Sequence, residues 1–147
     1  MKRILAILLA LSIILLAGCG AKKSGMANDD FKAQMLEKGY EIVDATDKVN
    51  PNTIGAVSIA IKDGYQIEYY VAHSVDKAQT VYDLNVSSFK EVDGEENNSQ
   101  KGNYSSYEKT SADTFYTISK VDNTFIYSVA PVEYKDEIKQ VIKDLGY

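Results

Sequence analysis

Apolar and polar residues alternate along much of the chain after residue 54, and a period of two residues predicts β-strands. Val57, Ile59 and Ile61 alternate with small or polar residues, and the dipeptide Asp63-Gly64 then predicts a two-residue hairpin turn. We therefore expect a hairpin whose return strand runs to about Ala72. The same reasoning predicts further strands, at residues 40–45, 104–109, 114–121 and 124–130, the last two joined at Asp122-Asn123.

Three stretches instead repeat their apolar residues at helical spacing. A first helix, capped by Asn28 or Asp29, is expected to run to about Lys38, ahead of Gly39. Ser74 is a good N-cap for a second helix that reaches about Phe89. Pro131 precedes a third helix, whose apolar face is Tyr134, Ile138, Val141, Ile142 and Leu145.

These elements predict an α+β fold with an antiparallel sheet of about six strands and helices packed on one face. Residues 40–89 and 104–147 each follow the order strand, strand, strand, helix. A duplicated βββα unit is therefore one possible origin of the chain, which the low identity between the halves leaves open. The segment 91–103 carries almost no apolar residues and predicts a mobile acidic loop.

The first 19 residues have a separate character. Met1-Lys2-Arg3 is basic, an apolar run continues from Ile4 to Leu16 with only Ser12 as an interruption, and Leu16-Ala17-Gly18-Cys19 follows. This pattern resembles a bacterial lipobox. The resemblance implies export, lipid attachment at Cys19 and cleavage before that residue. The alternative is a transmembrane anchor, but the apolar run is about 15 residues long and a span needs about 20.

The resemblance divides the chain into three parts. Residues 1–18 are the expected signal peptide, residues 19–28 a lipidated flexible tether, and residues 29–147 a single domain. Cys19 is the only cysteine, so its lipidation would leave no thiol for a disulfide, for catalysis or for a metal. The net charge of −5 becomes more negative once Lys2 and Arg3 are removed, which disfavours nucleic acid as a partner.

Few residues suggest chemistry. His73 is the only histidine, and either a general base or a surface side chain fits its position. Asp93, Glu95 and Glu96 could supply oxygen ligands to calcium, but their spacing does not match an EF-hand loop. No phosphate-binding loop, nucleophile elbow or zinc-binding His-Glu-x-x-His motif is present. We expect no metal and no cofactor.

The 11 tyrosines are the most unusual feature of the composition. Tyrosine suits half-buried strands, and it also suits binding surfaces because it offers a large contact area at low entropic cost. If helices cover one face of the sheet, the open face would display Tyr70, Tyr107 and Tyr116. We treat these three residues as a candidate recognition surface.

Two classes of function remain. The first is a non-catalytic binding or protein-interaction module, held by lipid at Cys19 on the extracytoplasmic face of the membrane, with an envelope protein or peptide as a possible partner. The alternative is a small surface hydrolase that uses carboxylates. The chain resembles small lipoproteins of Gram-positive bacteria, and its bias toward Lys, Asn and Ile over Arg agrees with such a host. In a Gram-negative host the outer membrane would be expected, because Gly20 rather than aspartate follows Cys19.

Overall fold

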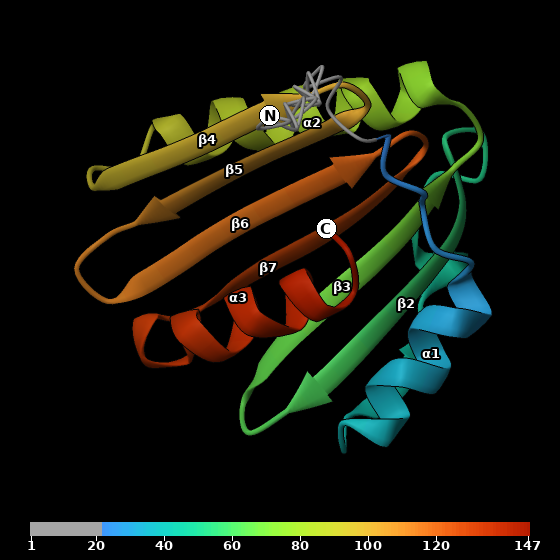
Figure 1. Ribbon diagram of the computed structural model, residues 1–147, viewed down its shortest axis with the longest axis horizontal. Coiled ribbons are helices and arrows are strands. Elements are labelled where there is room, and N and C mark those ends of the chain that lie inside the picture. The colour runs from blue at the N-terminus through green and yellow to red at the C-terminus, as the bar shows by residue number, and fades with distance from the viewer. Residues whose placement is uncertain (1–21) are drawn as a thin grey trace, which may run out of the picture.

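A computed structural model describes residues 22–147, which form an antiparallel sheet of seven strands flanked by helices (Figure 1). The order of the strands across the sheet is β1-β2-β3-β7-β6-β5-β4. The strands are β1 (Glu41–Asp44), β2 (Ile54–Lys62), β3 (Tyr65–Ala72), β4 (Glu95–Lys101), β5 (Tyr104–Thr110), β6 (Thr114–Val121) and β7 (Thr124–Pro131). The helices are α1 (Asn28–Glu37), α2 (Val75–Lys90) and α3 (Lys135–Asp144), with short 3-10 turns η1 (Thr46–Lys48) and η2 (Val132–Tyr134). The α+β class and the antiparallel sheet are confirmed.

Most neighbouring strands of this sheet are consecutive in the chain and are joined by short turns. Asp63 and Gly64 join β2 to β3 with φ values of 50° and 88°, and Asp122 joins β6 to β7 with a φ of 50°. Both predicted hairpins are therefore confirmed, since positive φ at these positions matches the twist of the paired strands. One pairing between distant segments completes the sheet: β3 lies antiparallel to β7 and joins the β1–β2–β3 meander to the β4–β5–β6–β7 meander.

The helices lie on both faces of the sheet, so the prediction of helices on one face was wrong. The α1 and α3 helices pack on one face with Phe31, Tyr69 and Ile126 in their core. The α2 helix packs on the other face over β3, β5, β6 and β7, with Tyr82 and Phe125 in a second core (Figure 1). Central strands such as β6 and β7 bury residues on both faces, and such burial hides which face a helix will cover.

The segment predicted as a mobile acidic loop, 91–103, contains the seventh strand. The β4 strand pairs with β5 along its whole length, from Glu95 opposite Thr110 to Lys101 opposite Tyr104. Its side chains are almost all exposed, because it lies at the outer edge of the sheet. An edge strand with polar and charged residues is a common protection against pairing with other chains, and it carries no apolar alternation for a sequence pattern to reveal.

The two βββα units are present in the chain as β1–β2–β3–α2 and β5–β6–β7–α3, but their geometry differs. The antiparallel β3–β7 pair would exchange under a two-fold axis perpendicular to the sheet, and that operation would place both helices on the same face. The α2 and α3 helices lie on opposite faces. The two halves are therefore not related by such a symmetry, and β4 has no counterpart in the first unit.

The predicted tether is fixed to the domain over its described part. The Lys23 backbone N–H donates to Asn103 Oδ1 at 3.0 Å, and Asn103 Nδ2 donates to the Lys23 carbonyl oxygen at 2.7 Å. Further along, the Tyr69 hydroxyl donates to the Met26 carbonyl, and the Met26 side chain packs against the α1–α3 core. Cys19 and the signal-peptide segment lie outside the described residues.

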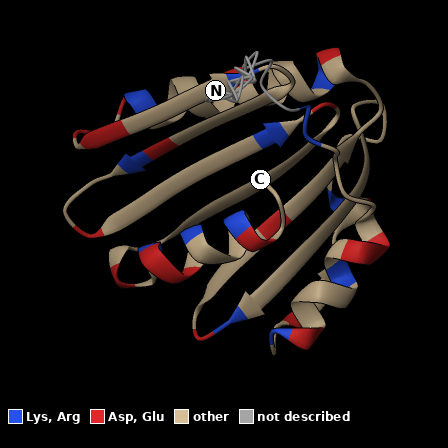
Figure 2. Ribbon diagram, in the orientation of Figure 1, with Lys and Arg blue, Asp and Glu red and all other residues tan. Residues whose placement is uncertain are grey.

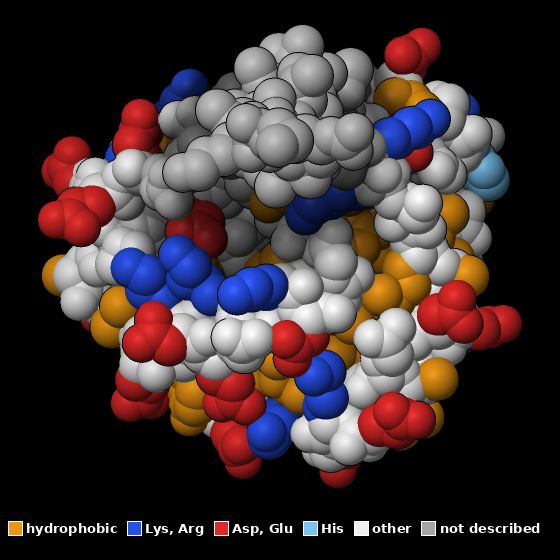
Figure 3. All heavy atoms as spheres, in the orientation of Figure 1, with side chains coloured by type: hydrophobic (Ala, Val, Ile, Leu, Met, Phe, Trp, Pro, Cys, Tyr) orange, Lys and Arg blue, Asp and Glu red, His pale blue; other side chains and the backbone are white. Residues whose placement is uncertain are grey.

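Ion pairs connect α3 to neighbouring segments on the face of the sheet that α1 and α3 cover. Lys38 reaches Asp144 at 2.8 Å, Lys62 reaches Glu137 at 2.9 Å and Lys139 reaches Glu108 at 2.8 Å. Figure 2 shows acidic and basic residues interspersed along α3, and Figure 3 shows hydrophobic side chains between charged ones on the same face of the molecule. Within residues 22–147, no helix has both the length and the apolar character needed to span a membrane.

We predict that Gly94→Ala loosens the edge strand. Gly94 has a φ of 152°, and a Cβ added there would lie 2.2 Å from the Thr110 carbonyl oxygen. The substitution should destabilise the attachment of β4 by about 2 kcal/mol, measured by hydrogen exchange of the β4 and β5 amides. Gly64→Ala is the matched control: its φ is 88° but a Cβ would meet no atom within 4 Å, so we expect about 1 kcal/mol of global destabilisation. Equal exchange profiles for the two variants would contradict the prediction.

Candidate functional site

The three candidate tyrosines lie on the same face of the sheet, as expected, but α2 covers much of that face. Tyr107 is only 2% exposed, and its hydroxyl donates to Glu96 Oε2 at 2.6 Å. Tyr116 is partly buried against Phe89, with the two ring centroids 5.2 Å apart. Tyr70 is the one of the three that lines the cavity described below. The expectation of an open tyrosine face therefore fails, because α2 packs on the side that was expected to be bare.

The other candidate residues from the sequence, His73 and the acidic residues of segment 91–103, do not lie together in one site. His73 is exposed, and its Nε2 lies 2.9 Å from the Pro51 carbonyl oxygen. In the acidic segment, Glu96 lies 3.7 Å from Lys109, and the hydrogen bond from Tyr107 lowers the pKa of the Glu96 carboxyl. In the part of the chain that the structure describes, no three histidine, cysteine or acidic residues are grouped so as to hold a metal ion.

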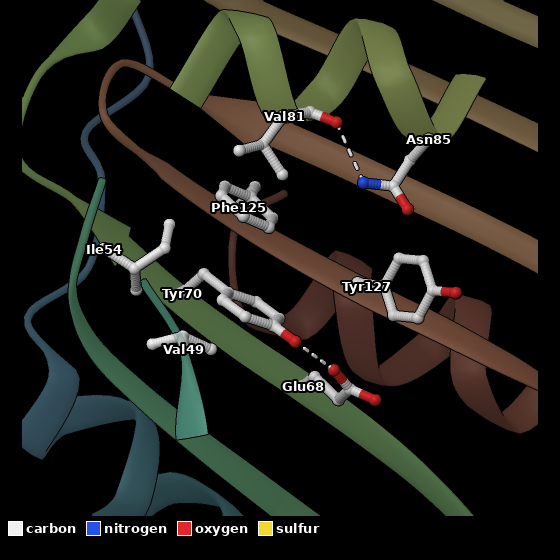
Figure 4. Close-up of a pocket in the computed structure, with 8 residues that line it drawn as sticks. All are labelled: Val49, Ile54, Glu68, Tyr70, Val81, Asn85, Phe125 and Tyr127. Atoms are coloured by element: carbon white, nitrogen blue, oxygen red, sulfur yellow. Dashed lines mark hydrogen bonds between the residues drawn. The ribbon is translucent and has the colours of Figure 1, made fainter. Parts of the chain in front are cut away.

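A cavity of about 440 Å³ lies between α2, the centre of the sheet and the segment that leads into β2 (Figure 4). Its volume falls in the usual range for small-molecule sites, about 300–1,000 Å³. It is bounded by apolar side chains together with a few polar groups: Val49, Ile54, Glu68, Tyr70, Val81, Asn85, Phe125 and Tyr127.

The β3–β7 pairing builds the floor of the cavity. Glu68 lies opposite Tyr127 and Tyr70 lies opposite Phe125 in the register of the two strands. Residues two apart on a strand point to the same face, so these four side chains form one continuous patch. The rings of Tyr70 and Phe125 stack with centroids 4.6 Å apart and an interplanar angle of 9°.

Two further elements form the walls. The α2 helix contributes Val81 and Asn85, which lie one helical turn apart on the same side of the helix. Opposite α2, Val49 follows η1 and Ile54 begins β2. The sheet beyond this wall is not covered by α2 on this face, and Val43 of β1 is 46% exposed there. The cavity therefore lies where the cover of α2 ends.

Hydrogen bonds fix the polar groups of the cavity. Glu68 accepts from Gln66 Nε2 at 2.6 Å through Oε1 and from the Tyr70 hydroxyl through Oε2. Asn85 Nδ2 donates to the Val81 carbonyl at 2.8 Å, which leaves Asn85 Oδ1 directed toward the cavity (Figure 4). The polar side of the cavity is thus held in place by its own neighbours.

The electrostatic environment keeps both phenols neutral. Burial raises the pKa of Tyr70, and the hydrogen bond to the Glu68 carboxylate raises it further. Burial also raises the pKa of Tyr127, with a smaller contribution from the Glu68 charge. Among the described residues, no lysine or histidine nitrogen lies within 4 Å of the Glu68 carboxylate. The cavity therefore has a single negative charge beside aromatic rings.

Sequence reasoning did not identify most of this site. The expected return strand, which runs to about Ala72, puts Glu68 and Tyr70 on one face because they are two residues apart. The sequence gives no reason to bring them beside Phe125 and Tyr127, which lie far along the chain. The available signal was a charged residue two positions before a tyrosine, in a strand whose other residues, apart from Gln66, are apolar or aromatic. The comparisons give no further guide, since no protein-family model, curated protein or solved structure matches the chain.

We predict that Tyr107 has a structural role under α2. Tyr107→Ala should destabilise the domain by about 3 kcal/mol or more in urea unfolding, because it removes a buried ring that contacts Phe89. Tyr107→Phe retains the ring and loses one hydrogen bond, so it should cost about 1 kcal/mol. A stable Tyr107→Ala variant that only loses binding to a ligand or partner would instead support the original recognition hypothesis for this residue.

Proposed function

We propose that this protein is a lipid-anchored lipoprotein of the extracytoplasmic face of the membrane and that it acts as a non-catalytic binding module. The cavity between α2 and the β3–β7 pair is its proposed binding site. The observation that carries this proposal is a cavity of small-molecule size with aromatic walls and fixed polar groups on one side. Apolar walls with a few oriented polar groups are the usual composition of binding sites for small molecules.

The attachment of the N-terminal segment supports a position close to the membrane. The backbone is held at Lys23 by Asn103, which leaves four residues from Cys19 to that point. An extended chain spans at most 3.3–3.6 Å per residue, so a lipid at Cys19 would lie within about 15 Å of Lys23. The β4–β5 and β6–β7 turns, which lie beside this segment, would then be the membrane-proximal end of the domain.

Binding is favoured over hydrolysis by the donor set of the cavity. Hydrolases that rely on carboxylates commonly use a pair of them with different protonation states. The cavity contains one carboxylate, Glu68, together with two phenols and an amide. These groups can orient and hold a ligand, and no observation in the described residues favours the hydrolase alternative.

The first prediction of the proposed function concerns the lipid anchor at Cys19. Cys19→Ser should move the protein from the membrane fraction to the soluble extracytoplasmic or culture fraction and should abolish incorporation of labelled palmitate, since the hydroxyl does not replace the thiol as the lipid acceptor. The wild-type chain, which has no other cysteine, is the control. Retention of the Cys19→Ser chain in washed membranes would show that something other than the lipid holds it there.

The cavity makes the second prediction. Val81→Trp should fill the cavity from α2 and abolish ligand-induced thermal shifts in a screen of small envelope-derived compounds against the mature chain (residues 19–147, Cys19→Ser). The partly exposed position of Val81 should keep the loss of stability of the free protein below about 1 kcal/mol.

Leu84→Trp is the matched control, because Leu84 lies on the same helix and is 67% exposed. Compounds that bind in the cavity should shift the melting temperature of wild type and Leu84→Trp equally. The proposed site would be contradicted if every compound shifted the melting temperatures of wild type, Val81→Trp and Leu84→Trp equally. It would also be contradicted if no compound lost its effect in Val81→Trp.

A further inference from the structure

Glu68 differs from Glu108, the other partly buried glutamate of the described residues, and from the more exposed Glu137 of α3. Glu108 and Glu137 each lie within 2.9 Å of a lysine nitrogen, at Lys139 and Lys62. Glu68 is also partly buried, but both of its hydrogen-bond donors, Gln66 and Tyr70, are uncharged. Moving a carboxylate out of water without a neighbouring cation costs free energy. The negative charge of Glu68 is therefore not balanced by a positive charge beside it.

The hydrogen-bonding positions that remain unused around Glu68 are acceptors. An ionised carboxylate offers about four lone-pair positions, and Glu68 uses one on each oxygen. The neighbouring Asn85 uses its amide nitrogen for the Val81 carbonyl, so its oxygen is the group presented to the cavity (Figure 4). A ligand that meets these groups must therefore bring donors, and the Glu68 charge favours positively charged donors.

The remaining walls fit the uncharged part of such a ligand. Val49, Ile54 and Val81 supply aliphatic surface, and Phe125 is held by its stack on Tyr70. The Tyr70 and Tyr127 rings are next to Glu68, where their faces can attract a cation as well. The cavity thus pairs an anionic, acceptor-rich side with an apolar side.

We infer that the cavity binds a small organic cation, a primary amine with an apolar body, whose ammonium group contacts Glu68 and Asn85 and whose body packs on Val49 and Val81. This inference rests on the proposed function, because it names the ligand class of the same cavity. A primary ammonium suits the site better than a quaternary one, since its N–H groups can donate to the free lone pairs.

The test uses four small probes of similar shape: phenethylamine, its trimethylammonium analogue, neutral 2-phenylethanol and anionic 3-phenylpropionate. Each is titrated into the mature chain (residues 19–147, Cys19→Ser) while the methyl NMR signals of Val49, Ile54 and Val81 are followed. Phenethylamine should bind most tightly, the trimethylammonium analogue and the alcohol more weakly, and the anion weakest. Glu68→Gln should weaken phenethylamine binding by about tenfold or more and change 2-phenylethanol binding by less than about twofold.

Glu95→Gln is the matched control, because it removes the same unit of charge from an exposed position on the edge strand β4. It should leave all four affinities within about twofold, since β4 lies three strands away from β7 in the sheet and exposed charges are largely screened by salt. Equal losses in Glu68→Gln and Glu95→Gln would show that only the net charge of the protein matters and would overturn the inference.

Two other outcomes separate the ligand class from the proposed function. If the alcohol or the anion perturbs the cavity methyls as strongly as the amine, the cavity is a binding site but its preference for cations is overturned. If none of the probes perturbs these methyls at millimolar concentration, the inference is overturned, whereas the proposed function is judged separately by the Val81→Trp and Leu84→Trp screen.

Discussion

The pairing of β3 with β7 is the constraint on which the rest of the structure depends. Tight turns or short connections join the other sheet neighbours, whereas β3 and β7 are brought together across α2 and three intervening strands. Without this pair the sheet would separate into two meanders, each with a bare edge. Closing so long a loop is entropically costly. The pair is favoured because it buries Tyr69 and Ile126 on one face and Phe125 on the other.

The same pairing explains why a cavity exists. The centre of the sheet is apolar on both faces, so a helix is needed on each side. On one face, α1 and α3 share this task, whereas on the other α2 lies over β3 and the β5–β7 half. The floor made by β3 and β7 therefore extends past the cover of α2. The segment from Val49 to Ile54 approaches from the far side and closes the space only in part.

The sequence predicted the local features of this fold and missed the features that depend on distant contacts. The turns at Asp63 and Asp122 were predictable because the short-range geometry selects those residues, and the Ser74 cap is confirmed by its acceptance of the Lys77 N–H. The β4 strand was missed because an edge strand needs no apolar pattern. The cavity was missed because its four floor residues meet only through the β3–β7 register. Of the candidate tyrosines, only Tyr70 lines this cavity.

Glu68 remains the residue that folding alone does not explain. Its position is half-buried on a central strand, opposite Tyr127 of the neighbouring strand and in the same cavity as Val81 of α2, where an aliphatic residue would pack well. Buried charges are often replaced by apolar residues without loss of stability, or with a gain. A carboxylate here therefore lowers stability relative to that alternative, and Gln66 and Tyr70 orient it without neutralising its charge. A cationic ligand would supply the missing positive charge. Binding would then remove the electrostatic free-energy cost that the free protein carries at Glu68, and this relief would add to the affinity.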